Sequence, residues 1–233
     1  ICGYTDEHAA LEEDLAQLKG TEAALLFPTG FQSNLGLLAA LGGPDTVFFS
    51  DALNHASIID GCRLAKGEVQ IYGHRDMNSL ETLLKESTAS TRVVVSDALF
   101  SMDGTLAPVP DLVRLCEQYG ALLVLDEAHS TLVFGENGGG VAEHFGLADR
   151  VDFHVGTLSK AVGAQGGFVA LSAKRRQWLL NTARSYVFTT SLPVPMVAGA
   201  RAALRAATPE LRGKLWKNME YLSAQLNVSM SSP

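Results

Sequence analysis

Two polar clusters in the sequence follow apolar runs that have the composition of buried strands. The first is Asp126-Glu127-Ala128-His129, which comes directly after Leu122-Leu123-Val124-Leu125. Open α/β sheets bind ligands at the carboxyl ends of their strands. Asp126 is expected to be largely buried there, and a buried carboxylate needs a cationic or hydrogen-bonding partner. A protonated pyridine nitrogen and an internal arginine would both meet that need, so Asp126 alone leaves a ligand-binding and a structural role open.

The second cluster contains a lysine whose surroundings suit a nucleophile. Gly156-Thr157-Leu158-Ser159-Lys160 follows an apolar run and precedes the glycine-rich residues 163–167. A lysine partly removed from water loses proton affinity and can form a Schiff base with a carbonyl compound. Most lysines are solvated surface charges, and Lys160 in isolation would be read as one of them. The position of Asp126, one strand and one connection upstream, favours a chemical role instead.

Phosphate could be bound at two places along the chain. The segment Thr29–Asn34 predicts a helix start at Gly30, where free backbone amides and the helix dipole favour an anion. The hydroxyl of Thr157 and the amides of its turn offer a second set of donors. A glycine at a helix start is common, so the first site is weak evidence by itself.

The elements that must position these residues alternate between short apolar runs and amphipathic stretches. This alternation is typical of an α/β domain with a mainly parallel sheet. Runs rich in Val, Leu and Phe without polar alternation predict strands covered on both faces, at residues 46–50, 92–97, 121–126, 152–155 and 167–171. Amphipathic periodicity predicts helices at residues 6–19, 30–41, 55–66, 79–86, 110–119 and 196–207, with a further helical segment from Pro209.

Composition and charge exclude several classes of protein. The chain has 233 residues, 47% of them hydrophobic, and a net charge of −7, so it has no basic face of the kind that binds nucleic acid. No apolar stretch is long enough to span a membrane. Three scattered cysteines without metal spacing indicate reduced thiols in an intracellular protein with no metal site. Because the sequence opens at Ile1 and stops just after a helical pattern, we expect it to be a fragment.

Several motifs together resemble the α-oxoamine synthases, a family of fold-type I enzymes that use pyridoxal 5′-phosphate (PLP). They occur in the family's order and with similar spacing, at Gly30-Phe31, Ser50–Ser57, Phe100–Gly104, Asp126–His129 and Gly156–Lys160. The resemblance implies an α/β fold with a mostly parallel central sheet between helices. It divides the chain into a large PLP-binding domain at residues 1–207 and the opening of a small C-terminal domain at 208–233. It also implies a homodimer with its active site at the interface.

The resemblance gives the candidate residues specific roles. Lys160 would bind PLP covalently and remove the α-proton of the amino-acid substrate. Asp126 would pair with the pyridine nitrogen and keep the ring protonated as an electron sink. His55 would stack on the ring and reach the substrate. The other implied cofactor contacts are Ser101 and His129 at the phenolic oxygen, Ala128 on the opposite ring face, Gly30, Phe31 and Thr157 at the phosphate, and Thr190 at the neighbouring subunit's phosphate.

Plainer roles remain open for several of these residues. His55 and His129 could be hydrogen-bonded cap or core histidines, and Ser101 could be a simple turn residue. Thr189 could serve in place of Thr190.

Members of this family condense an amino acid with an acyl-CoA, usually with loss of the amino acid's carboxylate. The segments 135–143, 160–167 and 192–196, with the opening residues 1–4, favour an 8-amino-7-oxononanoate synthase of plant type. That interpretation gives L-alanine and pimeloyl-CoA as substrates, a role in biotin synthesis, and a location in the cytosol or peroxisome. Glycine C-acetyltransferase, 5-aminolevulinate synthase and serine palmitoyltransferase are the alternatives within the family. A non-catalytic subunit is the alternative of another class, against which the presence of Lys160 and Asp126 argues.

Three residues depart from the family's pattern. Asp97 stands where the family often has glutamate, Glu127 where a second aspartate or a different residue is common, and Ser130 where glycine is frequent. Asp97 thereby shortens a carboxylate that is thought to support acyl transfer. In the family, the arginine that anchors the amino-acid carboxylate lies in the later domain. We therefore expect the fragment alone to lack a complete substrate site.

Overall fold

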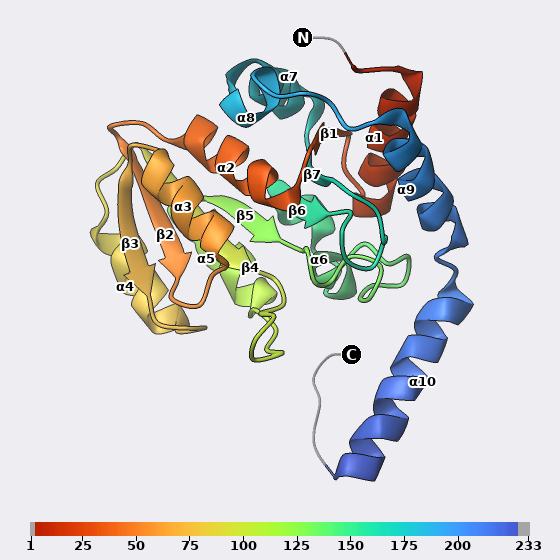
Figure 1. Ribbon diagram of the computed structural model, residues 1–233. Coiled ribbons are helices and arrows are strands. Elements are labelled where there is room, and N and C mark those ends of the chain that lie inside the picture. The colour runs from red at the N-terminus through yellow and green to blue at the C-terminus, as the bar shows by residue number, and fades with distance from the viewer. Residues whose placement is uncertain (1–2, 228–233) are drawn as a thin grey trace.

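A seven-stranded sheet between two layers of helices forms the body of the molecule (Figure 1). The computed structural model describes residues 3–227, so Cys2 and the end of the expected second domain lie outside the described residues. In spatial order the strands are β1 (Ala23–Phe27), β7 (Gly167–Leu171), β6 (Phe153–Thr157), β5 (Leu122–Asp126), β4 (Thr91–Asp97), β2 (Thr46–Asp51) and β3 (Glu68–Tyr72). β7 runs in the direction opposite to the other six strands, so the prediction of a mainly parallel sheet is confirmed.

All five predicted strands are present, within two residues of their expected ends, but two further strands were not predicted. β3 has the sequence Glu-Val-Gln-Ile-Tyr and lies at the sheet edge, where most of its residues are exposed. It therefore lacks the continuous apolar run of a buried strand. β1 reads Ala-Ala-Leu-Leu-Phe, and a short apolar run rich in helix formers cannot be told from a helix by periodicity alone.

The helices cover both faces of the sheet. One face is packed by α2 (Gly30–Leu41), α3 (Ala56–Leu64) and α7 (Ala173–Thr182). The other is packed by α4 (Met77–Glu86), α5 (Val109–Tyr119) and the short α6 (Val141–His144), and near β1 and β7 by α1 (Asp6–Lys19) and α9 (Val194–Ala206). The short α8 (Arg184–Val187) follows α7. The sheet is thus buried on both sides, as its apolar strands require.

Glycine ends two of the predicted helices as expected. Gly20 after α1 and Gly120 after α5 have φ values of +67° and +61°, and each amide donates to carbonyls of the last turn. This left-handed cap is costly for residues with a side chain and cheap for glycine.

The last helix, α10 (Pro209–Leu226), extends away from the body (Figure 1). It has no fully buried residue, and its indole at Trp216 donates to the Val133 carbonyl oxygen, 3.0 Å away. The boundary expected at residues 207 and 208 falls between α9 and α10, and the division into two domains stays a prediction. Over residues 3–227, none of the helices combines the length and the apolar character that crossing a membrane requires.

Candidate active site

The register of three parallel strands brings the predicted site residues together. Asp97, the last residue of β4, is paired with Asp126, the last residue of β5, and Asp126 is paired with Val155 of β6. A cavity of about 260 Å³ lies at these carboxyl ends. Its lining contains every predicted site residue except Thr190: Gly30, Phe31, His55, Ser101, Asp126, Ala128, His129, Thr157 and Lys160, with Thr29, Asn34, Ser57, Asp97, Gly156 and Ser159 beside them.

Asp126 is buried and held by two neutral donors. Its Oδ1 accepts from the Ala128 amide at 2.9 Å, and its Oδ2 accepts from Asn34 Nδ2 at 2.7 Å. The Oδ1 atom of Asn34 is itself buried and has no partner among the described residues. Within the described ranges Asp126 forms no ion pair, so the internal arginine that would give it a purely structural role is not found.

Lys160 lies beside His129, with 2.7 Å between Lys160 Nζ and His129 Nε2. Burial lowers the pKa of Lys160, while the charge of Asp126, and that of Asp97 when it is ionised, act in the opposite direction. The pKa of His129 is also lowered, by burial first and then by the charge of Lys160. Both shifts favour the neutral forms, and a neutral amine is the form of lysine that acts as a nucleophile or a base.

Asp97 holds a proton near neutral pH. Burial raises its pKa to about 8, and the charge of Asp126 adds to the increase. Its Oδ2 accepts from the backbone amide of His55 at 2.7 Å, which opposes the shift. Asp97, which stands where the family often has glutamate, therefore places a largely neutral carboxyl group next to Asp126.

His55 has both a local structural contact and a place in the cavity. It precedes α3, and its Nδ1 accepts from the Ser57 amide at 3.2 Å and lies 2.7 Å from Ser57 Oγ. Asn34 Nδ2 donates to the same Ser57 Oγ at 2.9 Å, which leaves the serine hydroxyl free to donate to His55. The ring is therefore a helix cap, the plainer role considered for it, and it also lines the cavity.

Glycine allows three backbone segments to approach closely at the expected phosphate side. A Cβ on Gly30 would lie 3.0 Å from Thr157 Cβ, and one on Gly167 would lie 2.4 Å from the Gly30 nitrogen. Gly30 and Phe31 open α2, where an α-helix has no internal acceptors for its amides. Thr157 Oγ1 donates to the Gly166 carbonyl at 3.0 Å. The one proton of the Thr157 hydroxyl is thus engaged, and the free amides at the start of α2 are the groups that suit an anion.

Thr190 does not reach this cavity. It lines a separate cavity of about 290 Å³ with residues that include Tyr4, His8 and Tyr186. Its expected contact with a neighbouring subunit stays a prediction.

Asn34 and Ser57 were not predicted as site residues, although both lie inside motifs used for the prediction. Asn34 is a buried amide on α2, whose other buried positions are largely apolar or small. A polar side chain on the buried face of a helix is the signal that could have identified it, because such a group must find a partner.

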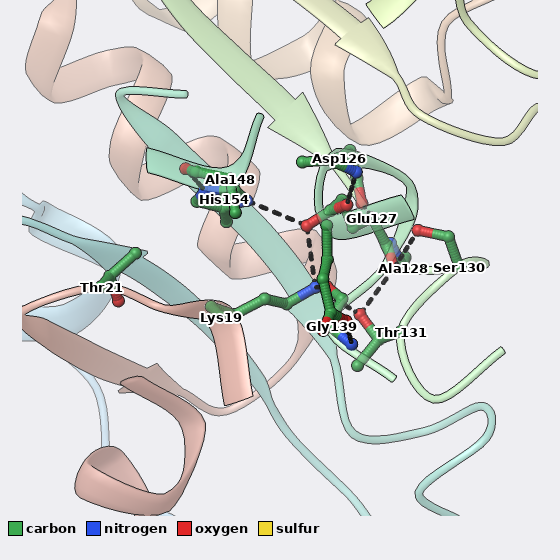
Figure 2. A network of polar contacts seen from close by, with 12 residues as sticks. Lys19, Thr21, Asp126, Glu127, Ala128, Ser130, Thr131, Gly139, Ala148 and His154 are labelled. Carbon is green, nitrogen blue, oxygen red and sulfur yellow. Dashed lines mark hydrogen bonds and ion pairs between the residues drawn. The ribbon is translucent and has the colours of Figure 1, made fainter. Parts of the chain in front are cut away.

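Glu127, the second departure, belongs to a buried network behind the site (Figure 2). Lys19 Nζ donates to Glu127 Oε2 at 2.8 Å, to Thr131 Oγ1 at 2.9 Å and to the Gly139 carbonyl at 2.5 Å. His154 Nδ1 lies 2.9 Å from the same Oε2 atom. Burial opposes ionisation of Glu127, but the charges and hydrogen bonds of Lys19 and His154 lower its pKa to about 2. Ser130, the third departure, is buried beside this network and donates to the Glu127 carbonyl at 3.4 Å.

Comparisons with known proteins identify the family of this chain. The family profile described as aminotransferase class I and II matches residues 1–231. The 8-amino-7-oxononanoate synthase of Geobacter sulfurreducens is 53% identical over 88% of this chain and 52% of its own length. The enzyme of the same name from Arabidopsis thaliana is 48% identical over the whole chain and 53% of its own length. The chain thus spans about half the length of the curated relatives it matches.

Solved structures show the same fold. A serine palmitoyltransferase from Sphingomonas wittichii matches with a TM-score of 0.93 at 38% identity, over 97% of this chain and 57% of that one. A serine palmitoyltransferase with PLP matches with a TM-score of 0.89 at 36% identity, over 93% of this chain and 55% of that one. The fold-type I architecture predicted from the sequence is confirmed.

Proposed function

Because the chain belongs to the aminotransferase class I and II family, we propose that the cavity at the ends of β4, β5 and β6 binds PLP for an acyl-CoA condensation. The observation that carries this proposal is the pairing of Lys160 with His129 in a cavity whose buried Asp126 has no cationic partner among the described residues. A lysine and an unpaired buried carboxylate in one cavity match the two ends of a pyridinium aldehyde.

The residues present fit PLP in charge and in shape. Asp126 would accept the pyridinium proton, with Asn34 and Ala128 holding the carboxylate in place. Ser101 and His129 would meet the phenolic oxygen, and Ala128 would pack against the ring. The phosphate would lie where the amides of Gly30 and Phe31 adjoin Thr157, a place that side chains on the surrounding glycines would close. When bound there, PLP supplies an electron sink for negative charge that develops at the substrate's α-carbon.

The protein's own groups would then move protons and orient the substrate. Lys160, whose pKa burial lowers, would accept the α-proton of the amino acid. His129 lies close enough to Lys160 to orient its amine. The ring of His55, held through Nδ1 by Ser57, keeps its Nε2 for a hydrogen bond to the substrate's carboxylate or thioester carbonyl.

For the substrates, we propose L-alanine and pimeloyl-CoA, which makes the reaction the formation of 8-amino-7-oxononanoate in biotin synthesis. The support is the name shared by curated relatives at 48 and 53% identity. The alternative is serine palmitoyltransferase, which the fold also favours but at the lower identity of 38%. The proposal includes an intracellular homodimer in which Thr190 crosses the interface, with residues 208–233 opening a second domain.

The test uses full-length protein with Lys160→Ala. We expect the visible absorption band that forms on adding PLP to the parent to be absent in the variant, because no amine remains to bond the aldehyde. Persistence of the band would contradict the assignment of Lys160. Turnover of pimeloyl-CoA with alanine, compared with acetyl-CoA and glycine, tests the substrates. Faster turnover of the second pair would move the assignment to a glycine C-acetyltransferase.

A further inference from the structure

The turn that carries Ser101 is short and exposed. The Phe100 amide donates to the Thr105 carbonyl at 2.9 Å, the Gly104 amide donates to the Phe100 carbonyl at 2.9 Å, and Leu99 forms an antiparallel bridge with Leu106. At its tip the side chain of Met102 is 92% exposed. Two hydrogen bonds in an exposed turn are weak restraints, so the position of Ser101 must also depend on contacts from outside it.

His74 supplies such contacts at the base of the turn. Its ring meets the Phe100 ring edge-on, with 4.4 Å between the centroids and an angle of 84°. Its Nε2 lies 3.0 Å from Thr105 Oγ1. One side chain therefore contacts both residues that close the turn. His74 itself is not among the residues that line the cavity.

Asp51 fixes His74 and also the segment that leads to His55. Its Oδ1 lies 2.9 Å from His74 Nδ1 and accepts from the Leu53 amide at 2.9 Å, and its Oδ2 accepts from the Arg75 amide at 2.9 Å. Asp51 is the last residue of β2, and its side chain is 2% exposed. A single buried carboxylate thus joins the connection before His55 to the histidine that contacts the Ser101 turn.

The two contacts of His74 do not depend on one charge state. Since the Asp51 carboxylate only accepts, Nδ1 of His74 carries a proton. Nε2 then accepts from the Thr105 hydroxyl when the ring is neutral and donates to it when the ring is charged, because a hydroxyl can do either. The chain Asp51–His74–Thr105 is therefore a permanent support rather than a pH switch.

We propose that His74 is a positioning residue, which through Asp51 and Thr105 holds the Ser101 turn in a fixed relation to His55 across the cavity. Its connection to catalysis rests on the proposed PLP function, since Ser101 and His55 act there. The support itself is a property of the protein without cofactor and can be measured in that form.

The test compares His74→Phe, which keeps a ring against Phe100 and removes both hydrogen bonds, with Thr105→Val, which removes only the hydroxyl. In full-length protein without PLP, we expect His74→Phe to speed amide exchange at Phe100 and Gly104 by about tenfold, the effect of losing two net hydrogen bonds. Exchange in β4 should not change.

Thr105→Val should give a smaller increase in exchange at Phe100 and Gly104, and His74→Gln, whose amide can still reach Thr105, should restore part of the protection. His144→Phe is the matched control, because His144 also packs edge-on against a phenylalanine but, within the described residues, has no contact with the Ser101 turn.

A second measurement separates this inference from the proposed function. With PLP bound, we expect His74→Phe to shift the pH midpoint of the visible absorption band, since a displaced Ser101 would no longer reach the phenolic oxygen. Faster exchange without that shift supports the positioning role and contradicts the contact of Ser101 with PLP. Unchanged exchange at Phe100 and Gly104 in both His74→Phe and Thr105→Val overturns the proposal, whatever the spectrum.

Discussion

Asp126 and Glu127 follow one another at the end of β5, and their carboxylates point into different surroundings. Glu127 is met by the ammonium group of Lys19, by His154 and by the Ala142 amide, which donates to its Oε1 at 3.0 Å. Asp126 is met by two neutral N–H groups and lies beside a second carboxyl, that of Asp97.

The Glu127 carboxylate therefore stabilises the fold, whereas the Asp126 carboxylate is placed to bind a ligand. Around Glu127 the donors have acceptors within the protein, and the pKa of the carboxyl is low because its ionised form is well bonded. Around Asp126 the charges and hydrogen-bonding groups are not fully paired within the described residues. The neighbouring Asp97 has a raised pKa, Lys160 has a lowered one, and one amide oxygen of Asn34 is unpaired among the described residues. Incomplete electrostatics of this kind mark functional sites.

Removing the charge of Glu127 should have the largest effect on stability. Glu127→Gln leaves the Lys19 ammonium buried and uncompensated, so we expect the free energy of unfolding to fall by about 3–5 kcal/mol. Lys19→Met should have a similar effect, and the double variant should lose less than the sum of the two. Urea denaturation measures all three. The matched control is Glu117→Gln, which breaks the exposed ion pair with Arg150 and should cost far less, because solvent screens an exposed pair. Equal losses in the buried and exposed pairs would contradict the structural role of Glu127.

Changing Asp126 should affect activity rather than stability. Asp126→Asn keeps the shape and removes the charge that would hold the pyridinium proton. We expect kcat/KM of the full-length enzyme with L-alanine and pimeloyl-CoA to fall by about 10²–10³-fold. The free energy of unfolding without PLP should change by less than about 1 kcal/mol, because no cation depends on this carboxylate for its partner. A loss of stability as large as that of Glu127→Gln would erase the distinction between the two residues.

Acid should destabilise the protein through Glu127. The folded-state pKa of about 2 lies below the ordinary value of 4.5, so the contribution to stability is complete above pH 4.5 and is lost as the pH falls towards 2. The loss is on the order of 2–3 kcal/mol. Denaturant midpoints between pH 6 and 3 would show it, and Glu127→Gln should have a flatter profile than the parent over that range. Parallel profiles would contradict the low pKa.

Asp97 should give stability the opposite pH dependence. Its pKa rises from 3.8 to about 8 on folding, so the folded protein binds the extra proton and stability falls as the pH rises from about 4 to 8. Asp97→Asn mimics the protonated carboxyl and can still accept from the His55 amide. We expect it to remove that decline and to be more stable than the parent at pH 8. An unchanged slope between pH 5 and 8 would show that Asp97 is ionised in the folded state.

Local pattern predicted most of the fold, whereas His55, Ser101, Ala128 and His129 of the cavity were expected only from the family resemblance. The five Val-, Leu- and Phe-rich strands were predicted because burial on both faces selects such residues, whereas the edge strand β3 lacks that signature. Asp126 was predicted because it ends such a strand, and Lys160 because it comes shortly after the next strand with Asp126 upstream. The Lys19–Glu127 pair could not be, since its partners are 108 positions apart and no local pattern couples them. The same holds for Asn34 and Asp126, which are 92 positions apart.

Libraries designed to change the substrate range should leave Gly30 and Gly167 unvaried. A methyl group at Gly167 would lie 2.4 Å from the Gly30 nitrogen, so we expect selection to recover only glycine there, and one at Gly30 would crowd the Thr157 side chain at 3.0 Å. Phe31, by contrast, lines the same cavity with a side chain that is 42% exposed and can change in size without displacing backbone. Substitutions that change the cavity's shape are therefore expected at Phe31 and not at Gly30 or Gly167.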